Sequence, residues 1–450
     1  MQNSPNSALT QVVREVAQPL TGANTDYDAL MDFIGDARVV LLGEATHGTH
    51  EFYQARAQIT SRLIREKGFS AVAVEADWPD AYRVNRYVRD ISDDATGEEA
   101  LSGFKRFPVW MWRNLDVLAF VEWLGGHNQR LPEGGRQAGF YGLDLYSLYA
   151  SIEAVISYLE KVDPEAAERA RYRYSCFDHY GEESQSYGYA AEFGLSQSCE
   201  DEVINQLIEL QRHTAKYMKR DGRLAEDEFF YAVQNARLVK NAELYYRSMF
   251  QDRVSSWNVR DRHMAETLGE LIAYLDKQGG RTNVVVWEHN SHIGDARATT
   301  MGQEGELNVG QLVRERYGNE AVLIGFSTYT GTVTAASAWN APYERKRVRS
   351  ALAGSYEKLF HETMGQRDFL VLWRGNQMAS SALLGPRLER AIGVIYLPQT
   401  ERISHYFRAR MPEQFDAVIH FDETLAVEPL DRTSLWESGE EVPETYPYAV

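Results

Sequence analysis

Short apolar, β-branched runs alternate with amphipathic segments over the first third of the chain. Buried strands are expected at three such runs: 38–42, 71–75 and 139–143. Helices are expected around them at 27–34, 50–67, 79–88 and 115–125, with a loop over 92–112. The segment 50–67 has the clearest helical spacing, and Gly68 ends it. This alternation of strand and helix is typical of an α/β core.

The pattern changes between about residues 147 and 277, where strand signals disappear. Long amphipathic helices are expected there at 149–161, 199–218, 226–250 and 259–277. A polar segment rich in Ser and Tyr, residues 176–198, is expected to form a loop between two of them. We interpret this part of the chain as a helical insertion packed on or over the core.

Strand patterns return in the last third of the chain. Strands are expected at 283–289, 321–329, 330–336, 369–373, 391–397 and 417–421, the second and third being separate strands or a hairpin. The predicted fold class is α/β, with a mostly parallel sheet core, helices on both faces and a large helical insertion. The predicted division is 25–146 and 281–425 for the core, 147–280 for the insertion or cap, and 426–450 for a C-terminal tail.

Composition and charge narrow the function classes. The chain has 450 residues, 44% hydrophobic and 25% charged, with a net charge of −18, so it is expected to be globular rather than disordered. The acidic balance argues against a nucleic-acid partner and against an anionic membrane surface. No apolar stretch of ~18 residues and no signal-peptide pattern occur, so we expect a cytoplasmic protein. The two cysteines form no CxxC pair and suit a reducing compartment.

Four predicted strands run into ionisable residues at their carboxyl ends. These residues are Glu44 and His47, Glu75, Asp144, and the segment 288–292 with its two histidines. Ligands of open α/β sheets bind in the crevice beyond the carboxyl ends of the strands. We therefore expect these groups to share one site.

Each acidic or histidine candidate also has a purely structural reading. Glu44 and His47 are three apart, and a helix beginning near residue 45 would keep the imidazole neutral, as a general base must be, or make the pair an N-cap cluster. Glu75 is either catalytic or paired with an arginine, Arg83 or Arg86. His289 and His292 are either functional or satisfied core histidines.

Aromatic residues and one arginine extend the candidate site. The cluster FPVWMW (107–112), which includes Trp110, and Tyr146 are core residues or line a broad cleft for a large ligand. Arg56 has three open roles: pairing with Glu44, pairing with Glu75, or polarising a substrate carbonyl. GxSxG, GxxxxGK[ST] and HExxH motifs are absent. The His, Glu and Asp that remain suit activation of water.

The segments GEATHGTHEFYQAR (43–56), VAVEADWP (72–79) and WEHNSHIGDA (287–296) together resemble the erythromycin esterase family. GFYGLDLYS (139–147) and VRDRHMAETL (259–268) are similar to further blocks of that family. The resemblance implies an α/β core with a large helical portion and an active cleft between them. It implies catalytic roles for His47, Glu44, Glu75 and His289. Arg56 and His292 match further positions of the family's motifs.

The leading hypothesis is therefore hydrolysis of a carboxylic ester, such as the macrocyclic lactone of a macrolide, by His/Glu-activated water. His47 is the first choice of base, and His289 is the second choice or stabilises the oxyanion. Substrate-binding roles are assigned to Arg56, His292, Trp110, Asp144 and Tyr146. No cofactor is expected, and the partner is a small ester or lactone. The alternatives are a metal-dependent hydrolase using the same cluster and a non-catalytic protein that binds a large ligand such as haem.

Overall fold

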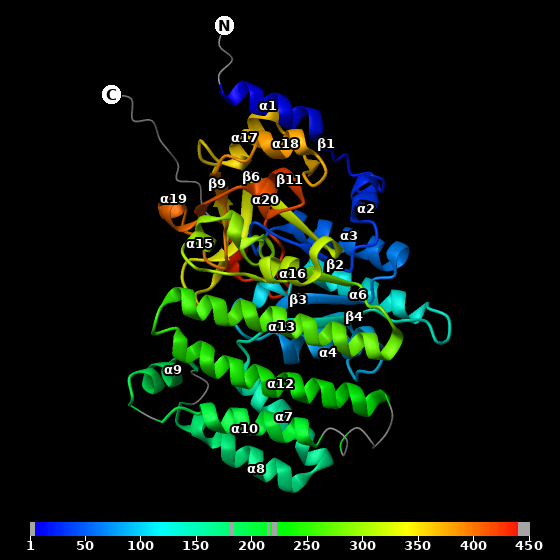
Figure 1. Ribbon diagram of the computed structural model, residues 1–450, viewed down its shortest axis with the longest axis vertical. Helices are drawn as coiled ribbons and strands as arrows, with labels where there is room; N and C mark the ends of the chain where they lie inside the picture. Colours follow the sequence, from blue (N-terminus) through cyan, green and yellow to red (C-terminus); the bar gives the residue numbers. More distant parts are fainter. Residues whose placement is uncertain (1–4, 181–183, 196, 214–216, 218–222, 440–450) are drawn as a thin grey trace.

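A nine-stranded sheet runs through the centre of the described residues (Figure 1). The computed structural model describes residues 5–180, 184–195, 197–213, 217 and 223–439. The strands of the sheet are β1 (Gln18–Pro19), β2 (Val39–Leu42), β3 (Ala71–Asp77), β4 (Gly139–Asp144), β5 (Val284–Trp287), β6 (Ala321–Ala336), β7 (Tyr343–Val348), β8 (Phe369–Leu372) and β11 (Ala417–Thr424). Their order is β1-β8-β11-β6-β2-β5-β3-β4, and β7 pairs with the far end of β6.

The central part of this sheet is parallel, which confirms the predicted mostly parallel core. All neighbours from β11 to β4 run in parallel, whereas β1, β7 and β8 pair in antiparallel fashion. Each face of the sheet has its own hydrophobic core, and successive residues of a strand point into opposite cores. Leu41 packs in one core and Leu42 in the other. Because both faces are covered, these strands are apolar throughout rather than alternating.

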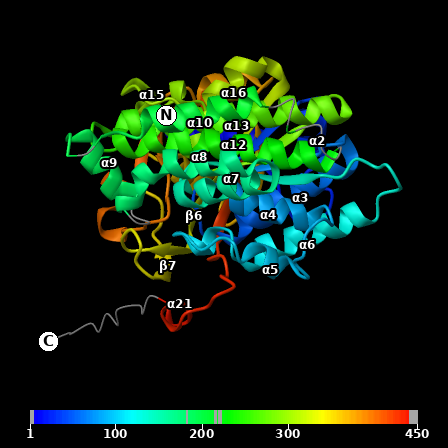
Figure 2. The ribbon, with the colours of Figure 1, turned by 90° about the horizontal axis from the view of Figure 1, so that it is seen from below.

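Two groups of helices cover the two faces. One face packs against α2 (Asp28–Ile34), α3 (His50–Lys67), α4 (Trp78–Val88), α5 (Gly97–Leu101) and α6 (Leu115–Gln129). The other packs against α1 (Pro5–Val16), α13 (Arg253–Gly279), α14 (Asn290–Ile293), α16 (Val309–Tyr317), α17 (Tyr356–Met364), α18 (Gln377–Ala382) and α20 (Met411–Gln414). Figure 2 shows α5 and α6 on one side of the molecule and α13 and α16 on the other.

The helical insertion extends the molecule away from the sheet in layers. It consists of α7 (Leu148–Val162), α8 (Pro164–Tyr174), α9 (Ser184–Glu192), α10 (Glu200–Arg212), α12 (Arg223–Ser248) and α13. Helix α13 lies nearest the sheet, followed by α12, then α7 and α10, with α8 outermost (Figure 1). Every helix of the described residues is too short or too polar to cross a lipid bilayer.

The expected loop at 176–198 is wrong over much of its length, because it contains helix α9 and a 3₁₀ turn, Ser175–Tyr180. Tertiary contacts fix α9: Tyr187 is fully buried and donates a hydrogen bond to Glu243 at 2.7 Å. A disulfide joins Cys176 to Cys199 across this segment. The cysteine count alone gave no sign of this pairing. Residues 181–183 and 196 lie outside the described part of the chain.

Three other expectations need correction. The loop expected at 92–112 contains α5 and a 3₁₀ turn, Val109–Met111. The two strands or hairpin expected over 321–336 are one strand, β6, because its first half pairs with β2 and its second half with β7. The strand expected at 391–397 is wrong, because this segment forms only isolated bridges, from Ile392 to Thr46 and from Ile395 to Ala336, within a connection between two other strands.

That connection lies between the two strands of a small second sheet, β9 (Arg387–Arg390) and β10 (Tyr406–Ala409). The short helices of this region are α15 (Thr300–Gln303) and α19 (Glu401–Ser404). After the last strand the chain returns over the core, where helix α21 (Ser434–Ser438) contacts β7. Trp436 of this helix donates a hydrogen bond to Thr334 of β6 at 2.8 Å. Residues 440–450 of the predicted tail lie outside the described residues.

Candidate active site

Strands β2, β5 and β3 lie side by side in the sheet, and their carboxyl ends are at the same edge. Leu42, Trp287 and Val74 are register partners across the three strands. The ionisable residues that follow each strand therefore meet at one edge of the sheet. Asp144 at the end of β4 joins them, because it pairs with Asp77 of β3.

The loop 43–49 is locked against the segment that follows β5. A Cβ on Gly43 would lie 2.1 Å from the side-chain oxygen of Asn290, so only glycine fits this close approach. The backbone N–H of Asn290 in turn donates to the Glu44 carbonyl at 2.8 Å. Helix α3 begins at His50, as the spacing over 50–67 predicts, so the helix start near residue 45 considered for Glu44 and His47 does not occur. Loop geometry, rather than a shared helix face, therefore brings Glu44 and His47 together.

Glu44 orients His47 and is itself held by Arg56. His47 Nδ1 lies 2.8 Å from Glu44 Oε1, and Arg56 donates to Glu44 Oε2 at 2.8 Å. Tyr53 donates to the His47 carbonyl at 2.9 Å. Because Nδ1 faces the Glu44 carboxylate, which also accepts from Arg56, Nδ1 carries the ring proton and Nε2 keeps its lone pair. Arg56 is 0% exposed, so of its three open roles the structure shows the pairing with Glu44.

Glu75 is paired with an arginine from the helical insertion. Arg260 of α13 donates to Glu75 Oε1 at 2.7 Å and makes two hydrogen bonds to Asp144, at 2.9 and 2.7 Å. Neither Arg83 nor Arg86, the partners considered from the sequence, pairs with Glu75; Arg83 pairs with Asp94 instead.

His292 is fixed on all sides. Its Nδ1 lies 2.9 Å from Asp261, and Arg260 donates to its Nε2 at 2.9 Å. The Trp257 ring stacks on the imidazole, with centroids 4.5 Å apart. Because Nε2 accepts from the guanidinium, the neutral ring carries its proton on Nδ1. This arrangement leaves His292 no free nitrogen, which suits a supporting role.

His289 has one nitrogen without a partner. The backbone N–H of Ser291 donates to its Nδ1 at 3.2 Å, which places the proton on Nε2. Nε2 is buried and makes no hydrogen bond in the described residues. The His289 ring centroid is 4.8 Å from that of His47. A buried N–H without an acceptor is costly, and substrate could supply the missing acceptor.

The pKa values of the two histidines, His47 and His289, are shifted in opposite directions. Burial lowers the pKa of His47, but Glu75 and the hydrogen bond to Glu44 outweigh it, so the pKa is raised above its ordinary value. Burial and the neighbouring His47 lower the pKa of His289 to about 3. Burial raises the pKa of Glu75, but the Coulombic interactions with His292, His47 and Arg260 outweigh burial, so the pKa lies well below its ordinary value and the carboxylate stays ionised. One histidine is thus suited to accept a proton, and the other stays neutral.

These residues face a cavity of about 630 Å³. Six of the nine predicted site residues line it: His47, Glu75, Asp144, Tyr146, His289 and His292. Glu44, Arg56 and Trp110 do not, since they lie behind the cavity wall. In place of Trp110, its neighbours Met111 and Trp112 line the cavity. The volume is within the range of small-molecule sites.

Sequence reasoning missed two groups of this site, Arg260 and Asp261. Both lie on α13, inside the helical insertion, so the rule about strand ends could not find them. The segment VRDRHMAETL (259–268) was noticed only as a family-like block, yet it contains both. The available signal was the charged run Arg260-Asp261-Arg262 within an otherwise amphipathic helix.

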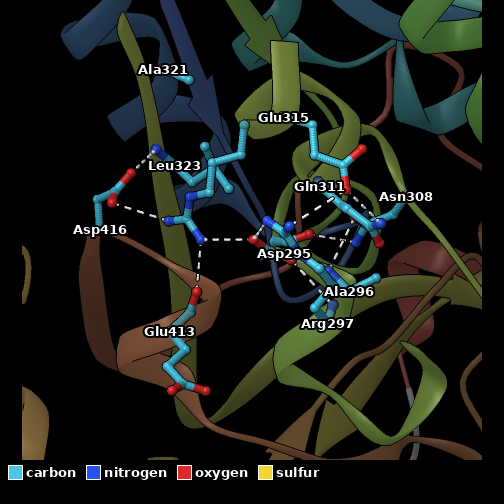
Figure 3. A network of polar contacts seen from close by, with 12 residues as sticks. Asp295, Ala296, Arg297, Asn308, Gln311, Glu315, Ala321, Leu323, Glu413 and Asp416 are labelled. Carbon is cyan, nitrogen blue, oxygen red and sulfur yellow. Dashed lines mark hydrogen bonds and ion pairs between the residues drawn. The ribbon is translucent and has the colours of Figure 1, made fainter. Parts of the chain in front are cut away.

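A polar network fixes the segment that carries the two histidines (Figure 3). Arg314 donates to Asp295 at 3.1 Å and to Asp416 at 3.0 Å, and Asp416 also accepts the Leu323 backbone N–H at 2.8 Å. Asn308 donates to the Ser291 carbonyl at 2.8 Å. The segment after β5 is therefore tied to β6 and β11, which holds the histidine positions rigid.

The metal-dependent alternative has little support from the side chains. Among the residues described, no three or more His, Cys, Asp or Glu are grouped so that they could hold a metal ion. The carboxylates of Glu44 and Glu75, proposed as ligands, instead pair with His47 and with arginine.

Comparison with known proteins gives a consistent result. A family model described as Erythromycin esterase matches residues 64–424. A putative hydrolase of Bacillus subtilis, YbfO, is 23% identical over 90% of this chain and 88% of its own length. The type II erythromycin esterase of Escherichia coli is 22% identical over 69% of this chain and 73% of its own.

Solved structures share the fold. A mutant erythromycin esterase in its open conformation aligns with a TM-score of 0.66 at 17% identity, covering 92% of this chain and 98% of that one. At this identity the likeness concerns the fold alone.

Proposed function

Because the chain belongs to the erythromycin esterase family, we propose that it is a hydrolase that cleaves carboxylic esters with an activated water molecule. The observation that carries this proposal is the pairing of an oriented base, His47, with an unpartnered donor, His289, in the wall of the same cavity. A base and a donor on either side of one point are what attack of water on a carbonyl requires.

His47 is the proposed general base. Its Nδ1 proton is held by Glu44, so the lone pair of Nε2 is free to take a proton from water. The positive charge that then forms on the ring is stabilised by Glu44 and by Glu75, whose Oε1 lies 3.9 Å from Nε2. Base catalysis of this kind is worth about 10²–10⁴-fold.

His289 is the proposed oxyanion donor. As water attacks, the carbonyl oxygen gains negative charge, and the Nε2–H of His289 would donate to it. Because the pKa of His289 is lowered to about 3, this ring is a neutral donor and a poor base. The protonated His47 then returns its proton to the leaving alkoxide, and the products are a carboxylic acid and an alcohol.

Arg260 and Glu75 are the proposed electrostatic frame. Arg260 forms ion pairs with two carboxylates at the strand ends, Glu75 and Asp144, and its guanidinium carbon lies 4.9 Å from the ring centroid of Tyr146. This arrangement keeps Glu75 ionised next to the base without leaving an unpaired charge in the protein interior.

The finer proposal is a macrolide-type lactone as substrate. It is supported by the erythromycin esterases among the relatives and by a cavity whose lining combines polar groups with Phe104, Trp112 and Trp257. Ring opening of a lactone uses the same chemistry as ester hydrolysis, with the alcohol remaining attached to the acid.

The test is turnover of erythromycin and of simple aryl esters by wild type and His47→Ala, followed by mass spectrometry. Ring opening adds the mass of one water molecule. We expect His47→Ala to reduce kcat by about 10²–10⁴-fold, whereas His50→Ala, a half-exposed histidine paired with Asp116, stays within about twofold of wild type. Equal turnover by correctly folded His47→Ala would remove His47 from the mechanism.

A further inference from the structure

A disulfide closes part of the helical insertion, outside the catalytic cluster. Cys176 lies in the 3₁₀ turn after α8, and Cys199 directly precedes α10, with their Cα atoms 6.0 Å apart. The chain has only these two cysteines, so every thiol reaction of the protein involves this pair. Cys199 is 0% exposed, whereas Cys176 is only half-buried. A thiol from solution therefore reaches the bond from the Cys176 side.

The disulfide is connected to helix α9 through a buried tyrosine, Tyr187. The backbone N–H of Cys199 donates to the Tyr187 hydroxyl at 2.8 Å, and this hydroxyl donates to Glu243 of α12 at 2.7 Å. The Tyr187 ring also packs on Phe177, the residue after Cys176, with ring centroids 4.8 Å apart. The same tyrosine thus contacts both ends of the crosslinked segment and holds α9 on α12.

Helix α9 also packs directly on the backbone of α12. A Cβ on Gly188 would lie 2.1 Å from the carbonyl oxygen of Tyr246, so only glycine permits this close approach. The hydrogen bond to Glu243 and this backbone contact lie within the last turns of α12. The position of these turns therefore depends on where α9 is held.

The last turns of α12 carry two tyrosines that contact the cavity wall. The Tyr245 hydroxyl lies 3.1 Å from the Tyr146 hydroxyl, and Tyr246 donates to the Tyr146 carbonyl at 3.1 Å. Tyr146 lines the cavity. A continuous series of hydrogen bonds and close contacts thus joins the disulfide to the cavity wall.

From this arrangement we infer that the Cys176–Cys199 bond is a redox-sensitive link, which sets the position of α12 and, through it, the position of Tyr146. The sequence predicts a reducing compartment, and disulfides that form in such compartments are usually transient, catalytic or redox-sensing. The reductant is a dithiol. The effect on substrate affinity rests on the proposed ester hydrolysis, whereas the effect on α12 does not.

The reaction is a thiol–disulfide exchange in two steps. A thiolate of the dithiol attacks Cys176 Sγ and forms a new S–S bond, while the Cys176–Cys199 bond breaks and its electron pair leaves on Cys199 Sγ, which takes up a proton. The second thiolate of the reductant then displaces Cys176 Sγ, which also takes up a proton. The dithiol is oxidised to a disulfide, and the protein gains two thiols.

Reduction is expected to loosen α9 without disturbing the catalytic groups. The two cysteines are 23 residues apart, and without the bond the segment between them is no longer a closed loop. Helix α9 then gains conformational freedom, so its contacts with α12 open more often. The loops that carry His47 and His289 follow strands of the sheet and take no part in this series of contacts. We therefore expect reduction to change substrate affinity rather than the chemical step.

The experiment is hydrogen–deuterium exchange with mass spectrometry, on oxidised protein and on protein reduced with dithiothreitol. We expect amide exchange in α9 and in the last turns of α12 to become about tenfold faster on reduction, with exchange in the central strands unchanged. Reoxidation with glutathione disulfide should restore the slow exchange. With an ester substrate, KM should rise about three- to tenfold on reduction, while kcat stays within about twofold.

Two variants serve as controls. The double variant Cys176→Ser with Cys199→Ser should exchange like reduced wild type and should not respond to dithiothreitol, which excludes an effect of the reductant elsewhere. Tyr187→Phe keeps the disulfide but lacks the hydrogen bond to Glu243. It should show faster exchange in α12 even when oxidised.

Unchanged exchange in α12 after complete reduction would overturn the inference. Free thiols that persist in glutathione disulfide would overturn it too, because the bond would then not form. Global unfolding on reduction would mean that the bond is purely structural, and an unchanged KM would refute the connection to the cavity. Because exchange is measured without turnover, a failure to hydrolyse esters would contradict the proposed function and leave the exchange result intact.

Discussion

Two histidine clusters of the described residues lie on the same sheet, and they differ in whether they line the 630 Å³ cavity. In the second cluster, Ser327 of β6 and His420 of β11 are register partners, and Ser327 Oγ lies 2.9 Å from His420 Nδ1. Asp422 Oδ1 lies 3.5 Å from His420 Nε2. By residue type this set matches a Ser-His-Asp triad, whereas the His47 cluster contains no nucleophile.

Access separates the two. Ser327, His420 and Asp422 are 1%, 0% and 3% exposed, and none of them lines the cavity. His47 and His289 are also buried, but they form its wall. Residue types and distances therefore do not make a site, because a substrate must also reach the groups.

The two clusters also differ in the charged groups that surround their histidines. The His47 cluster gathers carboxylates around Arg260, and the pKa values of His47 and His289 are shifted in opposite directions. The second cluster satisfies Ser327 through His420 and is packed between Phe360 and Phe369. Such a cluster stabilises the pairing of β6 with β11, and the comparison suggests four tests.

The largest expected effect is at Arg260. Arg260→Gln leaves Glu75 and Asp144 buried without their cation, so we expect a loss of stability of about 3–5 kcal/mol. Because the frame of His47 is also disturbed, kcat/KM should fall at least about 100-fold. Thermal unfolding and ester turnover measure the two effects. Arg260→Lys, which keeps the charge, should retain more stability than Arg260→Gln; equal loss in both would show that charge is not what matters.

The next effect is the pH dependence of turnover. Since His47 must be unprotonated and its pKa is raised, kcat should fall about tenfold per pH unit below a midpoint that lies above 6.5. His289, with a pKa of about 3, should add no transition between pH 5 and 9. Rate profiles over this range are the measurement. A midpoint below pH 5 would instead favour His289 as the base.

A smaller effect is expected on stability at Glu288, next to the site. This residue is 0% exposed, neither of its oxygens has a partner in the described residues, and burial raises its pKa well above the ordinary value. The folded protein therefore holds a proton that the unfolded chain releases above pH ~4.5. Wild-type stability should fall as the pH rises from there towards the raised pKa.

Glu288→Met removes that cost and should stabilise the protein by roughly 1–3 kcal/mol at pH 8, with a smaller gain at pH 5. Urea unfolding at both values measures the difference. Glu98→Met, an exposed glutamate on α5, should change stability by less than about 0.5 kcal/mol. A gain that does not depend on pH would contradict the assignment.

The smallest effect is at the sealed cluster. Ser327→Ala should leave kcat/KM within about twofold of wild type, because Ser327 does not reach the cavity. Turnover of the same esters checks this. A loss of 100-fold or more in a folded variant would mean that the second cluster is catalytic and would reverse the comparison.

Much of this arrangement could be read from the sequence. The apolar runs that end in Glu44, Glu75, Asp144 and His289 predicted both the parallel strands and the edge where the site lies. This prediction succeeded because the alternation of apolar and polar residues, and the residue at which an apolar run stops, can both be read from a short stretch of sequence. The assignment of Glu44 and His47 to one helix did not hold, since the loop conformation depends on the contact between Gly43 and Asn290.

The sequence by itself determined the residue types, the class of fold and the edge of the sheet that carries the charges. Only the tertiary structure decided that Arg260 reaches this edge from the insertion, that Arg56 stays behind Glu44, and that His420 is sealed. The physical reason is that burial and pairing depend on segments far apart in the chain. The side-chain type decides whether a residue can be charged. Its ion-pair partner and its exposure to solvent are decided only when the chain folds and distant segments pack together.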